Sequence, residues 1–220
     1  MMQVKCFTMK TYNENTYIVY DETNECILID CGCQTIEERL WITNFIESRN
    51  LKVCGLLCTH CHLDHTIGNA FFSYRYNVHP EANEGDRRLS EMTNYQAIAL
   101  GVSEEIDEYQ PIYTLEDGVV VKFGNTELQV IHTPGHTQGS VCLYDEADHI
   151  LISGDTLMKH SVGATNLPGG RKKTLQTSIE TRLFVLPDDV IVYSGHGEPT
   201  TIGEEKRNNK FEAAESVRQG

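Results

Sequence analysis

The chain has 220 residues and a formal net charge of −14 at pH 7, which argues against a nucleic-acid ligand because phosphate binding needs a basic face. A chain of this length buries a sizeable core, so we expect residues 1–220 to form a single domain. No apolar run approaches the width of a bilayer, and the eight cysteines come without a signal-peptide pattern at residues 1–10. These features predict a cytoplasmic protein with reduced thiols and no membrane partner.

The first 30 residues have the pattern of a strand meander. Short apolar runs of β type are separated by turn-forming clusters at 11–15 and 21–24. The last run ends at Asp30, and a carboxylate at the end of a buried strand is costly unless it accepts hydrogen bonds. We therefore expect Asp30 to brace the neighbouring ligand-rich loop from behind. A simple turn-starting role is the alternative.

An amphipathic helix is predicted next, ending near residue 50. Its expected core face consists of Ile36, Leu40, Trp41, Phe45 and Ile46. A buried strand at 53–58 follows it.

The stretch Thr59–His65, called the ligand loop below, lies between that strand and a helix-like run at 67–76. Four of its residues are potential metal ligands: His60, His62, Asp64 and His65. The order strand, loop, helix places these side chains at the carboxyl end of a strand, where open α/β folds bind ligands. In extended backbone His60 and His62 share one side, while Asp64 and His65 continue around the bend.

Residues 81–110 change in character. Before them, 74–79 is predicted to form a short strand closed by Pro80. The polar stretch 81–88 precedes a helix-capable run at 89–100, which Gly101 ends. We interpret 81–110, the helical insert, as a flap near the site; a surface helix without substrate contact is the alternative.

The second half repeats one pattern, in which a strand and a tight turn deliver one ligand. A hairpin is predicted at 119–132 around Gly124-Asn125, followed by strands at 141–144, 150–152 and 190–193 and a helix containing Leu175, Ile179 and Leu183. The ligands that follow these strands are His136, Asp155 and His196.

Together these residues provide two ligand groups. His60, His62 and His136 suit one metal ion, Asp64, His65 and His196 suit another, and Asp155 is expected to bridge the two. Two ions so placed lower the pKa of a bridging water, and the resulting hydroxide can attack a carbonyl. Asp64 and Asp155 are the predicted catalytic carboxylates, with Asp64 as a proton acceptor. Zinc is the expected metal, and iron and manganese also accept this ligand set.

This layout resembles the metallo-β-lactamase superfamily. The matching motifs are Asp30, the ligand loop, His136, Asp155 and His196, in the family order. The resemblance implies an α+β fold, a four-layer αββα sandwich, with the site at one edge between two sheets. Segments 133–137, 154–157, 161–170 and 194–197 look most like the short, single-domain glyoxalase II-like hydrolases. Those enzymes imply a small-molecule substrate, a thioester of the hydroxyacylglutathione type.

Two features depart from that subgroup. The helical C-terminal extension of full-length glyoxalase II is expected to be missing, and Ala164 and Asn166 stand where short members often carry Arg and Asp. Lactone or β-lactam hydrolysis uses the same metals and stays open. A mononuclear iron oxygenase of the persulfide dioxygenase type, with His60, His136 and Asp155 as ligands, is a third reading. The acyl group, the thiol carrier and the oligomeric state are left open.

Overall fold

The computed structural model of the chain describes residues 1–102, 106 and 109–213. Its first half forms a six-stranded sheet with the strands in sequence order, antiparallel from β1 to β3 and parallel from β3 to β6. The strands are β1 (Gln3–Thr8), β2 (Asn15–Tyr20), β3 (Glu25–Ile29), β4 (Lys52–Leu57), β5 (Pro80–Ala82) and β6 (Ile112–Tyr113).

The second half forms another six-stranded sheet, in the order β12-β11-β10-β9-β8-β7. Its pairs are antiparallel except for β10 and β11, which run parallel. The strands are β7 (Val120–Phe123), β8 (Thr126–His132), β9 (Val141–Asp145), β10 (Ile150–Gly154), β11 (Ile191–Ser194) and β12 (Thr200–Thr201).

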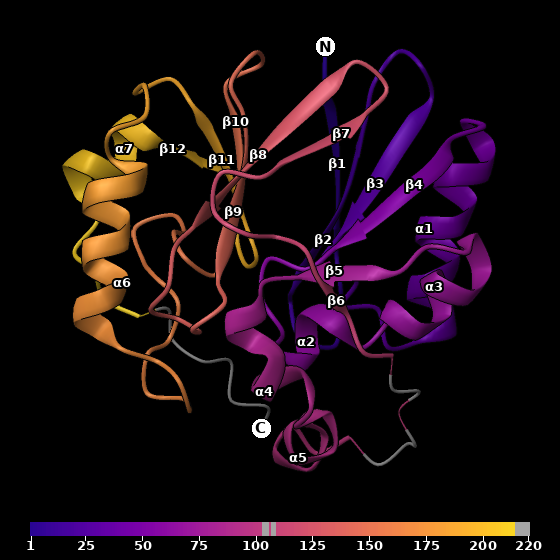
Figure 1. Ribbon diagram of the computed structural model, residues 1–220, viewed down its shortest axis with the longest axis horizontal. Coiled ribbons are helices and arrows are strands. Elements are labelled where there is room, and N and C mark those ends of the chain that lie inside the picture. Colours follow the sequence, from indigo (N-terminus) through magenta and orange to yellow (C-terminus); the bar gives the residue numbers. More distant parts are fainter. Residues whose placement is uncertain (103–105, 107–108, 214–220) are drawn as a thin grey trace.

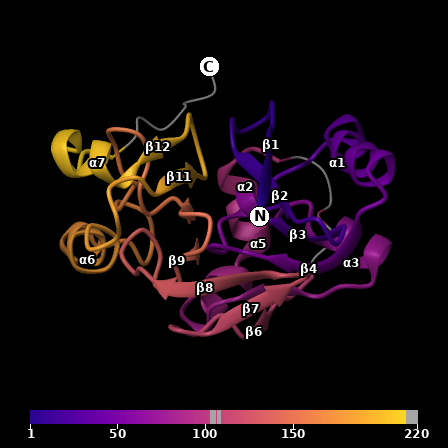
Figure 2. The same ribbon diagram turned by 90° about the horizontal axis from the view of Figure 1, so that it is seen from above.

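Helices cover the outer faces of both sheets. Figures 1 and 2 show α1 and α3 on one side of the molecule and α6 and α7 on the other, with the two sheets between them. The helices are α1 (Ile36–Ser48), α2 (Leu63–Thr66), α3 (Asn69–Tyr76), η1 (Glu84–Asp86), α4 (Arg87–Ser90), α5 (Thr93–Ala99), α6 (Lys172–Ser178), the π turn η2 (Ile179–Leu183) and α7 (Ile202–Asn208). This arrangement confirms the expected αββα sandwich.

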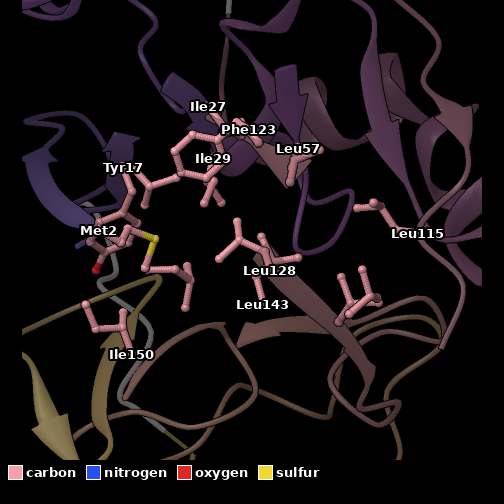
Figure 3. Close-up of a cluster of buried hydrophobic side chains, with 14 residues drawn as sticks. Met2, Tyr17, Ile27, Ile29, Leu57, Leu115, Phe123, Leu128, Leu143 and Ile150 are labelled. Atoms are coloured by element: carbon pink, nitrogen blue, oxygen red, sulfur yellow. The ribbon is translucent and has the colours of Figure 1, made fainter. Parts of the chain in front are cut away.

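Strand alternation explains the layers. In β2, Tyr17 and Val19 belong to the core between the sheets, whereas Ile18 packs toward α1 and α3. Figure 3 shows Tyr17 and Ile29 of the first sheet facing Leu128 and Leu143 of the second. Because both faces are covered, every residue of β2 is buried.

The fold collects the carboxyl ends of five strands at one edge. β3 runs parallel to β4, and β8, β10 and β11 share one direction in the second sheet. Asp30, the ligand loop, the His136 turn (residues 133–140), Asp155 and His196 directly follow these strands. The edge therefore holds every residue predicted to belong to the site.

Two expectations about local structure are wrong. Residues 74–76 end α3 instead of forming a strand, because Asn77 takes a left-handed conformation that stops the helix, and the next strand begins only at Pro80. In α1 the buried positions are Glu38, Ile42, Thr43 and Ile46, whereas Ile36 and Leu40 are exposed. Glu38 is buried because its carboxylate accepts hydrogen bonds from three backbone amides, including those of Thr35 and Lys10.

Residues 81 and 82 of the helical insert belong to β5, because they pair with Leu57 and β6, and the rest of the insert lies between β5 and β6, two neighbouring strands of the first sheet. The predicted helix at 89–100 is divided into α4 and α5, and residues 103–105 and 107–108 lie outside the described part of the chain. The sequence interpretation did not include β12 and α7. Among the described residues, no helix is both long and apolar enough to cross a bilayer.

The core between the sheets should dominate stability. Leu128 is fully buried there, so Leu128→Ala should lower the free energy of unfolding by ~2–5 kcal/mol. Leu40→Ala, at a side chain that is 50% exposed, should change it by less than about 0.5 kcal/mol. Urea denaturation of both metal-free variants measures the difference, and equal losses would contradict this placement of the core.

Candidate metal centre

The first ligand group consists of three imidazoles from two loops. His60 and His62 belong to the ligand loop after β4, and His136 follows β8. The Nε2 atoms of His60 and His136 are 3.2 Å apart, and His136 Nε2 is 2.9 Å from His62 Nδ1. Three ring nitrogens from positions up to 76 residues apart thus point at one place.

Hydrogen bonds on the opposite ring nitrogens fix two of the tautomers. His136 Nδ1 donates to the carbonyl of Ala164 at 2.7 Å. Thr59 Oγ1 donates to Asp30 at 2.6 Å, so it accepts from His60 Nδ1 at 3.1 Å. In their neutral forms the Nε2 atoms of both histidines therefore carry lone pairs that face each other at 3.2 Å, which is the arrangement that a cation ligand set presents. The group fits a divalent metal ion.

The second ligand group combines one carboxylate with two imidazoles. Oδ2 of Asp64 is 3.8 Å from His65 Nε2 and 3.5 Å from His196 Nε2. His65 Nδ1 lies 3.2 Å from Asp30, and His196 Nδ1 donates to the carbonyl of Asn13 at 3.0 Å. Both Nε2 atoms consequently face the carboxylate side of the site.

Asp155 lies between the two groups. Its Oδ1 is 3.6 Å from His65 Nε2, and its Oδ2 is 3.6 Å from His136 Nε2 and 3.7 Å from His196 Nε2. Within the described part of the chain, Asp155 Oδ1 and His65 Nε2 are buried without a hydrogen-bond partner. Unpartnered buried polar atoms are rare, and a bound cation satisfies both at once.

Gly195 allows this close arrangement. A Cβ at residue 195 would lie 2.2 Å from Asp155 Oδ1 and 2.6 Å from a ring carbon of His65. Any side chain there would occupy the space beside the ligands.

Asp30 lies behind the ligands. Its oxygens accept from Thr59 N at 2.7 Å, from Thr59 Oγ1 and from His65 Nδ1. Its φ of 52° is the left-handed conformation that Asp tolerates better than most residues. Asp30, His60 and His65 also lie close enough to be considered a ligand group, but these donors already occupy the carboxylate, which supports the bracing role.

The imidazoles of the two ligand groups have pKa values that are shifted in opposite directions. Burial and the neighbouring His65 and His136 keep the pKa of His60 well below its usual value, and burial together with His136 lowers the pKa of His62 to about 3. Burial also acts against the charged forms of His65 and His196, but Asp155 and Asp64 outweigh it and raise the pKa of both imidazoles.

The pKa values of the two carboxylates in the site are lowered. Burial disfavours their charged forms, but His65 and His196 outweigh it and lower the pKa of both Asp64 and Asp155. The second group therefore holds negative charge that attracts a proton or a metal ion.

The site opens to solvent on one side. His60, His65, His136 and Asp155 are buried. The side chains of Asp64 and His196 are 23% and 26% exposed, and His62 is also partly exposed. A substrate therefore approaches past these three residues.

Three residues of the N-terminal hairpin lie against the second ligand group and were not predicted from the sequence: Asn15 and Tyr17 contact the His196 loop, and Glu14 lies beside His65. Asn15 Nδ2 donates to the carbonyls of Ser194 and Gly197, and Tyr17 Oη donates to Ser194 O at 2.6 Å. Glu14 is fully buried, with Oε1 3.8 Å from His65 Nδ1, and burial raises the pKa of its carboxyl well above the usual value. The turn-like pattern at 11–15 did not indicate these contacts, because the partners lie far along the chain, about 180 residues later for Asn15.

Acidification should release the ion of the second ligand group before the ion of the first. A metal ion in the Asp64, His65 and His196 group displaces protons from imidazoles with raised pKa values, so its affinity falls at a higher pH than the affinity of the first group. His60 and His62 stay neutral to lower pH. Metal-to-protein ratios after dialysis between about pH 8 and pH 5 should therefore fall from two to one before reaching zero.

A His196→Ala variant, which lacks a ligand of the second group, should show only the more acid-resistant step. Loss of both ions from the unmodified protein in a single step would contradict the assignment.

Comparison with known proteins adds to this geometry. Residues 10–196 match the family described as the Metallo-beta-lactamase superfamily. The chain is 32% identical to Hydroxyacylglutathione hydrolase GloC of Haemophilus influenzae, over 96% of this chain and 98% of that protein. It is similar to the crystal structure of TTHA1623 in a di-iron-bound form, with 33% identity, a TM-score of 0.83 and coverage of 94% and 99%. It is also similar to the BLEG-1 B3 metallo-beta-lactamase, with 27% identity, a TM-score of 0.82 and coverage of 94% and 98%.

Proposed function

The chain belongs to the metallo-beta-lactamase superfamily, and on that premise we propose that it is a dinuclear metal-dependent hydrolase of thioesters, acting on substrates of the hydroxyacylglutathione type. The observation that carries the proposal is the pair of ligand groups facing each other across Asp155, whose two oxygens lie 3.6–3.7 Å from imidazoles of both groups. A mononuclear centre would leave Asp64, His65 and His196 without a role.

The ligands we propose are His60, His62 and His136 for one ion and Asp64, His65 and His196 for the other, with Asp155 shared. When bound, the two ions supply Lewis-acid activation of a water molecule and of the carbonyl oxygen. The chain's own residues orient these groups through fixed tautomers and exclude bulk water from the buried side. A Ser, Cys or Lys nucleophile is not required.

Asp64 is the proposed proton acceptor. Its side chain lies at the open side of the site, with Oδ2 3.5 Å from His196 Nε2. The imidazoles of His65 and His196 keep the pKa of Asp64 low against the effect of burial, so the side chain is ionised at neutral pH. A carboxylate in this position can accept the proton that water loses when it attacks the carbonyl carbon.

The thioester part of the proposal draws on the similarity to GloC, a hydroxyacylglutathione hydrolase. Glutathione carries carboxylates, and Ala164 and Asn166 provide no positive charge for them. Arg171, Lys172 and Lys173 line a groove beside the His136 turn, which Arg171 joins through a hydrogen bond from its N–H to Gly135 O at 2.7 Å. We propose that these cations replace the missing charge.

Zinc is the metal we propose, because histidine and aspartate ligands suit it. Iron has specific support as the alternative, since the similar TTHA1623 structure is in a di-iron-bound form. The similarity to BLEG-1 likewise favours β-lactam hydrolysis as a second candidate function.

Turnover and metal content should be measured together. Protein purified without chelators should hold about two ions per chain and hydrolyse S-lactoylglutathione, and a lactoyl thioester with an uncharged thiol should react with a higher KM. Asp155→Ala should reduce kcat/KM by at least roughly a thousandfold, because both ligand groups lose a shared oxygen. Asp189→Ala, at an exposed carboxylate paired with His149, is the control and should leave kcat unchanged.

Two bound ions without turnover of any thioester would contradict the substrate class; a chromogenic β-lactam then tests the second candidate. A single iron with oxygen consumption on a persulfide would contradict the dinuclear hydrolase itself.

A further inference from the structure

Asp86 of the helical insert is a buried carboxylate that contacts both loops of the first ligand group. Its side chain is 1% exposed. Oδ2 accepts from Cys61 N and from Thr137 Oγ1, each at 2.9 Å, and Oδ1 accepts from Gly139 N at 2.7 Å. A single carboxylate thus satisfies three donors from two segments that are distant in the sequence.

The positions of these donors relate Asp86 to the ligands. Cys61 lies between His60 and His62, and Thr137 directly follows His136. The carboxylate therefore fixes the main chain next to all three imidazoles of the first group. The two imidazoles of the second group are held from elsewhere, since Asp30 accepts from His65 and the carbonyl of Asn13 accepts from His196.

Two glycines permit the close approach of the insert and the His136 turn. A Cβ on Gly139 would lie 2.5 Å from Asp86 N and 2.7 Å from Asp86 Cγ. A Cβ on Gly85 would lie 2.6 Å from the carbonyl oxygen of Gln138. These contacts are too short for any side chain, so the backbones meet at the distance that brings Asp86 to the amide of Gly139.

A second side chain of the insert, Gln96, forms hydrogen bonds with the ligand loop. Gln96 Oε1 accepts from Leu63 N at 3.0 Å, while Gln96 Nε2 donates to Cys61 O at 3.2 Å and Leu89 O at 3.0 Å. Asp86 and Gln96 thereby bond both the N–H and the C=O of Cys61. The part of the insert that carries Asp86 and Gln96 therefore supports the ligand loop by hydrogen bonds.

We propose that Asp86 is a positioning residue that sets the affinity of the His60, His62 and His136 group for its metal ion, with Gln96 assisting it. The inference rests on the metal centre proposed above but not on its substrate. Without the carboxylate, the buried amides of Cys61 and Gly139 lose their acceptor, and the two loops separate to hydrate them. The three imidazoles then no longer converge, whereas the second group keeps its own supports.

Asp86→Asn is the direct test, because it keeps the size of the side chain and removes one acceptor oxygen. Zinc titration against a competing chelator should show that the affinity for one ion falls at least roughly tenfold, while the affinity for the other is unchanged. The absorption spectrum of the cobalt-loaded variant should change for the same ion.

Asp21→Asn is the matched control. Asp21 is also buried and accepts from two amides and from threonine hydroxyls, joining the β2–β3 turn to the β7–β8 turn. These turns lie at the opposite end of β3 from Asp30. Asp21→Asn should therefore lower the melting temperature but retain both metal affinities.

If Asp86→Asn does not fold, Gln96→Leu tests the proposal in its place. This variant should lower the affinity for the same ion. Unchanged affinities in the folded variants, or equal losses in Asp21→Asn, would overturn the proposal. The titration involves no substrate. Failure of the protein to hydrolyse thioesters would therefore contradict the proposed function and leave the role of Asp86 standing.

Discussion

The structure depends on one constraint: ring nitrogens of His60, His62 and His136 converge on one point inside the protein. Hydrogen bonds to Ala164 O and Thr59 Oγ1 occupy the outer nitrogens of His136 and His60, and their inner nitrogens, which carry lone pairs in the neutral rings, meet at 3.2 Å. Such an arrangement is unfavourable in the empty protein and becomes favourable when a cation enters. Binding a metal ion should consequently stabilise the fold as well as complete the site.

The two halves of the chain supply this constraint together. Parallel strands in each sheet bring their carboxyl ends to one edge, and the buried layer between the sheets keeps the two edges in contact. Three supports then hold the loops: Asp30 behind His65, the N-terminal hairpin beneath His196, and Asp86 between the ligand loop and the His136 turn. Each support comes from a different part of the sequence, so a change far from the ligands can disturb them.

The sequence predicted the fold and the seven converging residues because their signals are local. His60, His62, Asp64 and His65 stand within six positions, and apolar alternation identifies the strands that deliver His136, Asp155 and His196. It could not predict Glu14, Asn15 or Asp86, since a lone polar residue in a turn shows its meaning only through partners that lie far away along the chain. The buried face of α1 was predicted wrongly for a related reason. Glu38 is buried because it accepts hydrogen bonds from backbone amides, which the spacing of apolar residues does not indicate.

We propose that two ions bind across Asp155, one in each ligand group. Anomalous X-ray diffraction from a crystal of the metal-loaded protein tests it directly, because the signal locates each ion and its absorption edge identifies the element. We expect two peaks, one among His60, His62 and His136 and one among Asp64, His65 and His196, with Asp155 reaching both. A single peak, or a peak elsewhere in the chain, would contradict it.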